Sequence, residues 1–268
     1  MRLSERRQAM LQAMGIRLFA RARARAPSPA DGPAPAPQLP AAPAARVARV
    51  AHAVAAAAPA APVVQRQDPR PDIAALDWPA LRAAVAACRA CALCESRQQT
   101  VFGVGHPRAH WMIVGEAPGE QEDRLGEPFV GPSGQLLDNM LRALGLSRNA
   151  GPPERQVFIA NTLKCRPPNN RNPVAAETAL CAPFLERQIA LVQPRIIVAM
   201  GRFAAQALLA SDEPLGKLRG RIHIYRGVPL VVTYHPAYLL RTLADKARAW
   251  QDLCLAATVA AGGRPVNA

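Results

Sequence analysis

Residues 115–140 read GEAPGEQEDRLGEPFVGPSGQLLDNM, and this stretch decides how the chain is expected to fold. It follows residues 111–114, WMIV, an apolar run typical of a buried parallel strand. It ends in residues 135–144, whose apolar side chains recur at helical spacing. The stretch is therefore predicted to run from a strand through a shaped Gly/Pro-rich loop into a helix. In an open α/β sheet such loops bind ligands, because they leave the carboxyl ends of the strands and offer the free N–H groups of a helix start.

The same alternation of strands and helices continues along the chain. Strands are predicted at 100–104, 111–114, 157–161, 195–200, 222–225 and 229–233, and helices at 73–87, 135–144, 175–192, 202–209 and 246–260. Alternating strands and helices with short connections predict an α/β fold whose mostly parallel sheet is covered on both faces. We see no internal repeat.

The first part of the chain differs in composition from the rest. Residues 1–75 are rich in Ala, Pro and Arg without periodicity, so we predict a disordered tail there and a folded domain at 76–262. Residues 1–25 have the composition of a short basic amphipathic helix, and a mitochondrial-type address is the alternative. The longest apolar tract, 51–64, is interrupted by His52 and two prolines and is not expected to span a membrane.

The charge of the chain is strongly positive. The formal net charge is +14 over 268 residues. Residues 1–75 hold eleven arginines against four acidic residues, so half of the charge belongs to the remaining chain. A basic domain suits a polyanionic partner such as nucleic acid, and a general bias toward arginine in low-complexity sequence is the alternative.

Six cysteines occur in a chain without a secretory segment, which favours the reducing cytoplasm and metal or cluster ligation over disulfides. Cys88 and Cys91 form a C-x2-C pair with Cys94 three residues further on, and Cys165 and Cys181 flank a loop. Zinc knuckles, redox pairs and iron–sulfur centres all use such pairs. Cys254 is predicted to be a buried, inert thiol of the last helix.

Several motifs together resemble the family 4 uracil-DNA glycosylases, the iron–sulfur type. These are GEAPG at 115–119, Glu122-Asp123, GEPFVG at 126–131, GQLLD at 134–138, KCRPP at 164–168 and HPAYLLR at 235–241, and the resemblance covers about residues 80–256. It implies a three-layer sandwich with a central, mostly parallel four-stranded sheet flanked by helices. It also implies a 4Fe-4S cluster on Cys88, Cys91, Cys165 and Cys181. A zinc site on the same four thiolates is the alternative, and Cys94 is a competitor for the place of Cys91.

A DNA glycosylase takes a base out of the stack, reads its Watson–Crick edge and breaks a C–N bond, so it needs a stacking ring, an amide and a donor for the departing anion. The resemblance assigns these roles to three residues. Asn161 reads uracil, because its amide donates to O4 and accepts from N3–H. Phe129 stacks on the flipped base. His235 donates a hydrogen bond to uracil O2 as negative charge develops there.

The group that positions the attacking water is less clearly marked. Family 1 glycosylases carry an aspartate where this chain has Ala117, which we place with the substrate-binding residues. We predict that Glu122 holds the water or forms the wall against a thymine methyl, and that Glu116 orients the backbone of the loop. An oxocarbenium-like route demands little of the base, since the leaving group departs before water bonds strongly.

Contacts to the DNA backbone position the duplex without reading sequence. We predict them for Ser133, Arg202 and Arg241, and we expect the cluster to hold a DNA-contacting loop with Arg166 and Arg171. Leu239, four residues after His235, resembles the wedge that fills the gap left by a flipped nucleotide.

The sequence thus predicts a monomeric, cytoplasmic, monofunctional uracil-DNA glycosylase that acts on single- or double-stranded DNA and has no membrane partner. Turnover is expected, not covalent trapping of the base, because Ala117 follows Glu116 and no insertion precedes the HPA motif. The alternatives are a glycosylase of broader deaminated-base specificity, a non-catalytic iron–sulfur DNA-binding protein and a cluster-based electron carrier.

Overall fold

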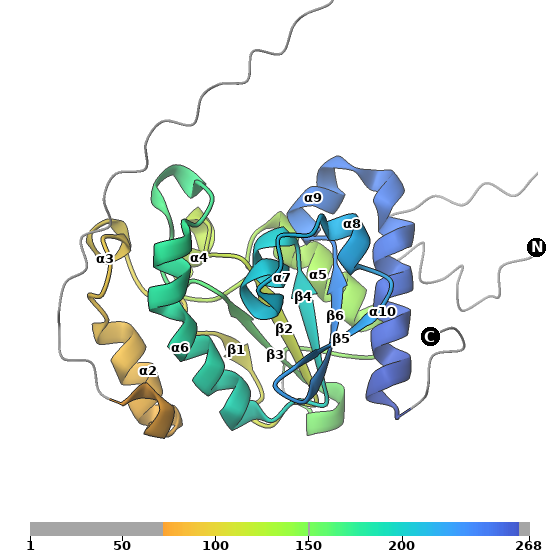
Figure 1. Ribbon diagram of the computed structural model, residues 1–268, viewed down its shortest axis with the longest axis horizontal. Coiled ribbons are helices and arrows are strands. Elements are labelled where there is room, and N and C mark those ends of the chain that lie inside the picture. Colours follow the sequence, from red (N-terminus) through yellow and green to blue (C-terminus); the bar gives the residue numbers. More distant parts are fainter. Residues whose placement is uncertain (1–71, 150, 263–268) are drawn as a thin grey trace, which may run out of the picture. The chain divides into compact units, whose positions relative to one another are not determined.

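The computed structural model describes residues 72–149 and 151–262, which form a six-stranded sheet in the order β1-β3-β2-β4-β6-β5 (Figure 1). The strands are β1 Val104–Gly105, β2 Trp111–Gly115, β3 Val157–Asn161, β4 Ile196–Met200, β5 Ile222–Tyr225 and β6 Val228–Thr233. β3, β2, β4 and β6 are mutually parallel, and β1 and β5 add antiparallel edges. The predicted α/β class is confirmed. The four-stranded sheet that the resemblance implies corresponds to the parallel centre and omits the two edge strands, although strands were predicted at 222–225, which is β5, and at 100–104, which reaches β1.

Helices surround this sheet. They are η1 Ile73–Ala75, α2 Trp78–Ala87, α3 Leu93–Ser96, α4 Glu120–Leu125, α5 Pro132–Ala143, η2 Pro153–Arg155, η3 Pro168–Asn170, α6 Ala175–Val192, α7 Arg202–Leu209, α8 Leu215–Leu218, α9 Pro236–Arg241, η4 Leu243–Asp245 and α10 Lys246–Ala260. The predicted helix at 73–87 is divided in two. The side chain of Asp77 accepts from the N–H of Ala80 and Pro79 follows it, so a new helix begins there.

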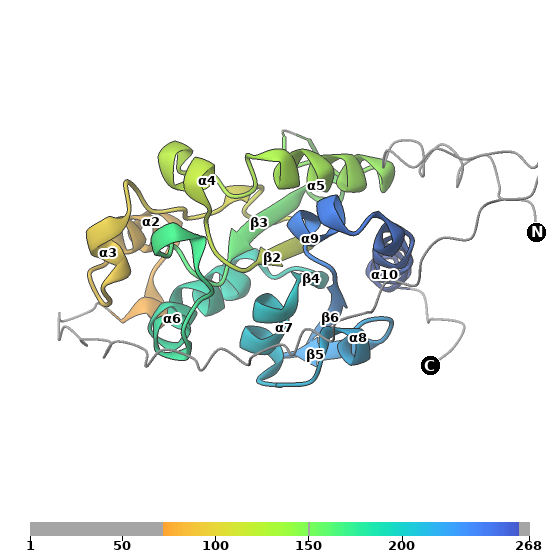
Figure 2. The ribbon, with the colours of Figure 1, turned by 90° about the horizontal axis from the view of Figure 1, so that it is seen from above.

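The two faces of the sheet form two hydrophobic cores. In β2, Met112 and Val114 face the core that α2, α6, α7 and α8 complete, whereas Trp111 and Ile113 face the core that α5, α9 and α10 complete. Side chains alternate along a strand, so a strand buried on both faces is expected to be apolar, as β2, β4 and β3 up to Ala160 are. Figure 2 shows the resulting three layers, with the sheet between the two sets of helices.

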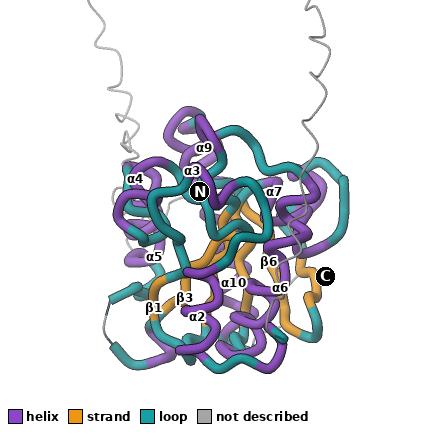
Figure 3. Tube along the Cα trace, turned by 90° about the vertical axis from the view of Figure 1, so that its left-hand side faces the viewer, coloured by secondary structure: helices purple, strands orange, loops and turns teal. Residues whose placement is uncertain are grey.

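The strand order places the ends of the parallel strands together. β2 pairs with β3 on one side and with β4 on the other, so the chain leaves β2 and returns to opposite sides of it. This is the topological switch point at which open α/β sheets bind ligands. α3, α4 and α9 lie toward the edge where these strands end (Figure 3).

The predicted tail at 1–75 lies almost wholly outside the described residues, as does the possible basic helix at 1–25. The boundary of the domain at 76–262 stays a prediction, and the described residues begin with a short helix at Ile73. Within the described ranges, no helix combines the length and the apolar character that crossing a membrane requires.

Candidate active site

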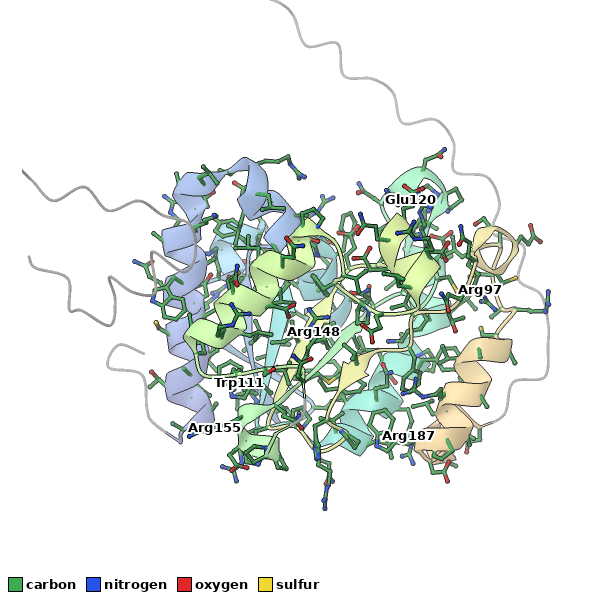
Figure 4. All side chains as sticks on the ribbon, turned by 180° about the vertical axis from the view of Figure 1, so that it is seen from behind. Arg97, Trp111, Glu120, Arg148, Arg155 and Arg187 are labelled. Atoms are coloured by element: carbon green, nitrogen blue, oxygen red, sulfur yellow. The ribbon has the colours of Figure 1, made fainter. Side chains whose placement is uncertain are left out.

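A cavity of about 710 Å³ opens at the carboxyl ends of the parallel strands. It gathers nine of the predicted site residues from four separate segments: Glu116, Ala117, Glu122, Phe129, Ser133, Asn161, Arg202, His235 and Arg241. The loops after β2, β4 and β6 and the end of β3 each contribute to it. Sheet register explains the convergence, since Gly115 pairs with Asn161 and Met200 pairs with Thr233. Figure 4 shows Glu120, which follows the first of these loops, at the opposite end of β2 from Trp111.

Asn161 is the last residue of β3 and is 2% exposed. Its Oδ1 is buried without a hydrogen-bond partner among the described residues. A buried acceptor without a partner costs free energy, so such an atom in a cavity wall indicates that a ligand donor completes it. The neighbouring strand leaves room for this amide only because residue 115 is glycine, since a Cβ there would lie 2.4 Å from Asn161 Oδ1.

Phe129 lines the same cavity as Asn161. Its ring stacks on the His235 imidazole with centroids 5.3 Å apart and an interplanar angle of 27°. Its backbone has φ 54°, a left-handed conformation that a bulky residue adopts only when its surroundings enforce it. Arg148 is one enforcing contact, because it donates to the Pro128 carbonyl at 2.8 Å and to Asp138 at 2.8 Å.

His235 caps the start of α9. Its Nδ1 accepts a hydrogen bond from the N–H of Ala237 at 3.2 Å, which leaves the proton of the neutral ring on Nε2. Burial lowers the pKa of His235 to about 4, so the imidazole is neutral at physiological pH. Gly201 allows this approach, since a Cβ at residue 201 would lie 3.0 Å from the His235 Cβ. The site thus holds an uncharged N–H donor.

The two glutamates of the loop have different surroundings. The Glu122 carboxylate accepts from the N–H groups of Gly119 at 3.1 Å, Val130 at 3.0 Å and Gly131 at 3.4 Å. Glu122 therefore joins the start of α4 to the turn that carries Phe129. Our prediction gave this loop-organising part to Glu116 and the water-holding part to Glu122.

Glu116 has the more reactive environment. Its carboxylate receives no hydrogen bond from any residue within the described ranges, and burial raises its pKa to about 7 while the charge of Arg202 opposes that shift. Its backbone carbonyl, in contrast, accepts from the Leu163 N–H at 3.1 Å. A carboxylate with a fixed backbone and a free, partly desolvated head is suited to hold a water molecule or a proton.

Arginines surround the mouth of the cavity. Arg202 begins α7 and packs over the Phe203 ring at 4.4 Å, and Arg241 ends α9 with its side chain exposed. Ser133 lies in the first turn of α5. Arg171 also lines the cavity, held by Glu177 through two hydrogen bonds of 2.5 and 3.0 Å. Arg166 lies apart from the cavity lining and donates to Asn170 Oδ1 at 2.8 Å.

The structure contradicts the prediction for Leu239. This side chain is 0% exposed and packs in the core beneath α9, so it cannot enter DNA without leaving that core. The prediction relied on the position of Leu239 four residues after His235. Because Pro236 begins a helix, the side chain at this position faces the core. Leu240, the next residue, is 43% exposed and adjoins Arg241.

A second cavity, largely apolar, collects cysteines. It is lined by Cys88, Cys91, Cys94, Cys165 and Cys181, together with Lys164 and Arg97. Burial raises the pKa of Cys165 to about 11 and that of Cys181 to about 12, and charges on Cys88 add to both shifts. Cys94 lines the same cavity as the four predicted ligands. Arg97 donates to Cys165 Sγ at 3.0 Å, and Figure 4 shows it at the end of the molecule that carries α3 and α4.

These residues fit an iron–sulfur cluster by their chemistry. Four thiols gathered in an apolar cavity with adjacent cations are the surroundings that a negatively charged thiolate cluster requires. In the part of the chain that the structure describes, no group of three or more His, Cys, Asp or Glu side chains is arranged to hold a single metal ion. The prediction for Cys254 is wrong, because its side chain is exposed on α10.

Sequence reasoning missed several residues of these sites. Tyr238 lines the first cavity, stacks on Tyr234 at 5.1 Å and donates to Asp245 Oδ2 at 2.6 Å. Phe203 and Asn170 line it as well. The signal for Tyr238 was present, since a residue three positions after the helix cap lies one turn further along the same face.

Comparison with known proteins agrees with this arrangement. The family model described as "Uracil DNA glycosylase superfamily" matches residues 102–254. A type-4 uracil-DNA glycosylase of Sulfurisphaera tokodaii is 43% identical over 165 residues, which are 58% of this chain and 72% of the relative. One from Pyrobaculum aerophilum is 40% identical over 190 residues, 67% of this chain and 93% of the relative. A type-5 uracil-DNA glycosylase of the same organism is 36% identical over 146 residues, which are 50% of this chain and 64% of the relative.

Proposed function

We infer that this chain, which belongs to the type-4 members of the uracil-DNA glycosylase superfamily, flips uracil out of DNA and hydrolyses its N-glycosidic bond, leaving an abasic site that starts base-excision repair. The observation that carries this proposal is the unpartnered Asn161 Oδ1 in the wall of the cavity. The imide N3–H of uracil is a donor that would complete it.

Asn161 would select uracil by the pattern of its amide. Its Oδ1 accepts from N3–H and its Nδ2 donates to O4, whereas cytosine presents an acceptor at N3 and a donor at C4. A mispaired buried amide costs about 1–3 kcal/mol per unsatisfied group, so two mismatches discriminate strongly against cytosine. The Phe129 ring would offer the flat surface on which the flipped base stacks.

His235 would stabilise the leaving group. As the N-glycosidic bond breaks, its electron pair moves into the uracil ring and negative charge appears on O2. The ring is neutral, since the pKa of His235 near 4 disfavours the imidazolium form, and its Nε2–H donates a hydrogen bond to that oxygen and keeps its proton. A fixed donor aimed at a developing oxyanion accounts for a large part of many enzymic rate accelerations.

Glu116 would position the attacking water. Its carboxylate is free of protein hydrogen-bond donors in the described residues, and Arg202 stabilises its ionised form. Water adds to C1′ of the sugar after the base has begun to leave, and Glu116 accepts the proton that water loses. Glu122 supports this chemistry indirectly by holding the loop that presents Phe129.

The DNA strand would cross the arginine-lined mouth of the cavity. Arg202, Arg241 and Ser133 at the start of α5 are placed to meet phosphates, which carry no sequence information. Leu240 replaces Leu239 as the proposed wedge, because it is exposed and adjoins Arg241, which lines the cavity. Among the described residues that line this cavity there is no lysine, which favours simple hydrolysis over a Schiff-base route.

We further propose that Cys88, Cys91, Cys165 and Cys181 hold a 4Fe-4S cluster. When bound, the cluster supplies a rigid covalent tie between the segment after α2 and the loop around Cys165, with four thiolates leaving no open position for substrate. The protein would act on DNA as a monomer in the reducing cytoplasm, where free cysteines persist.

A base-excision assay tests the proposed function. Full-length protein is incubated with a duplex carrying one uracil, and abasic sites are revealed by alkali. We expect cleavage of the uracil strand only after alkali, none on matched thymine or cytosine duplexes, and a loss of about 100-fold or more in Asn161→Ala and His235→Ala. Excision at an unchanged rate by both variants would remove these residues from the site.

A further inference from the structure

Lys164 lies between the two cavities and belongs to both neighbourhoods. It is 2% exposed. Its Nζ donates to the backbone carbonyl of Asn161 at 2.8 Å and to Gln188 Oε1 at 2.7 Å. Gln188 Nε2 in turn donates to the Phe102 carbonyl at 2.8 Å. The ammonium thus lies directly behind the residue that faces the base.

The other side of Lys164 meets the cysteines. Its side chain lines the cysteine cavity together with Cys165 and Cys181. A cluster with four thiolate ligands carries net negative charge, so Lys164 and Arg97 are the adjacent cations that balance it.

Lysine is rare among the basic residues of this chain, so its presence at position 164 is informative. Of its 33 basic residues only three are lysines, Lys164, Lys217 and Lys246. An ammonium is a compact point charge on a flexible stem, whereas a guanidinium is a broad planar fork. Lys164 is fully enclosed between the end of β3 and α6, where the compact group satisfies two carbonyl-type acceptors at once.

We propose that Lys164 is a positioning residue that couples the cysteine-bound cluster to the base-reading Asn161, because its ammonium donates to the Asn161 carbonyl while its side chain lines the cavity of Cys165 and Cys181. Fixing the carbonyl of Asn161 fixes the direction in which its Cα–Cβ bond, and hence its amide, points into the cavity. The cluster then contributes to base recognition through charge and geometry while touching no substrate. This inference rests on the proposed function only where uracil excision is measured; the measurement of the reduction potential does not depend on it.

The test compares Lys164→Met with two matched controls in full-length, iron-loaded protein. Methionine keeps the length of the side chain and removes its charge and donors. Arg97→Met removes a cation that touches Cys165 without reaching Asn161, and Lys246→Met removes another buried lysine that lies in α10. Each variant is measured for iron and sulfide content, for the reduction potential of the cluster, and for kcat and KM on uracil DNA.

We expect Lys164→Met to change two quantities together. The reduction potential becomes more negative, because a cation next to the thiolates is lost, and kcat falls by about 10- to 100-fold, the range for a hydrogen bond to a charged group, while KM for DNA stays near its original value. Arg97→Met also shifts the potential but lowers kcat by a smaller factor than Lys164→Met does, and Lys246→Met shifts neither. A merely structural role would leave the potential unmoved.

The outcomes separate the two proposals. Failure of the unaltered protein to excise uracil refutes the proposed function and leaves the potential measurement standing. Unchanged potential or unchanged kcat in iron-loaded Lys164→Met overturns the coupling. Should that variant not load iron, Lys164→Gln takes its place, with the same two shifts expected. Failure of both to load iron, while Lys246→Met loads it, would overturn the positioning role in favour of a requirement for folding.

Discussion

Replacing Gly115 by alanine should disable the cavity while leaving the fold in place. A Cβ on residue 115 would lie 2.4 Å from Asn161 Oδ1 and 2.6 Å from Phe129 Cζ, against 3.4–4 Å for ordinary contact. The amide, the ring or both therefore have to retreat by about 1 Å, and a misplacement of that size costs about 100-fold in rate. We expect kcat/KM on uracil DNA to fall by about that factor in Gly115→Ala.

The assay is single-turnover excision from a uracil duplex, run beside a thermal unfolding curve. Gly216→Ala is the matched control, because Gly216 is exposed in α8 and a Cβ there meets nothing within 4 Å. That control should keep its excision rate and gain about 0.4–1 kcal/mol of stability through the less flexible unfolded chain. A Gly115→Ala protein that excises uracil at the unaltered rate would refute the packing of Asn161 and Phe129 against residue 115.

Four further predictions concern the charge of Glu116, the contact with DNA and the cysteines. Because the pKa of Glu116 is raised to about 7, the excision rate should decline as pH falls through 7. Glu116→Gln should give a low excision rate that does not change with pH. A Glu116→Gln variant with the pH–rate profile of the unaltered protein would show that Glu116 does not position the water. Since this folded-state pKa exceeds the unfolded value of 4.5, the stability contributed by Glu116 decreases as pH rises from about 4.5 to about 7, and urea titrations at several pH values with Glu116→Gln as reference would show the difference. Leu240→Ala should slow excision from duplex DNA by about tenfold, which corresponds to about 1.4 kcal/mol out of the few kcal/mol that unstacking costs, and spare single strands, whereas equal loss on both substrates would contradict a wedge. Cys181→Ser should lose bound iron and sulfide while Cys254→Ser keeps both, as measured by metal analysis.

Long, strongly patterned elements were predictable from the sequence. The strand at 157–161 and the helices at 175–192, 202–209 and 246–260 have the predicted bounds, because periodicity over a full element outweighs local exceptions. The residues of the cavity were named from the motifs that carry the resemblance, and the parallel strands bring those motifs to one edge of the sheet. Helices of four to six residues, such as α4 and α9, are too short to show a period.

The errors have specific physical causes. Leu239 was taken for exposed because its spacing from His235 was read without the helix that Pro236 begins. The part played by Glu122 depends on three N–H groups, two of them in the turn at Val130 and Gly131, which no local pattern reveals. Lys164 was not singled out, because its burial depends on Gln188, a residue 24 positions away in α6. Long-range hydrogen bonds of this kind need the folded structure.

The measurement that tests the central claim most directly uses two DNA duplexes that differ by one methyl group. One carries uracil and the other N3-methyluracil, in which a methyl group replaces the donor proposed for Asn161 Oδ1. We expect rapid excision of uracil and no detectable excision of N3-methyluracil by the unaltered protein, because the buried acceptor would then face a methyl group. Excision of both bases at similar rates would show that Asn161 does not read N3–H and that the cavity does not work as described.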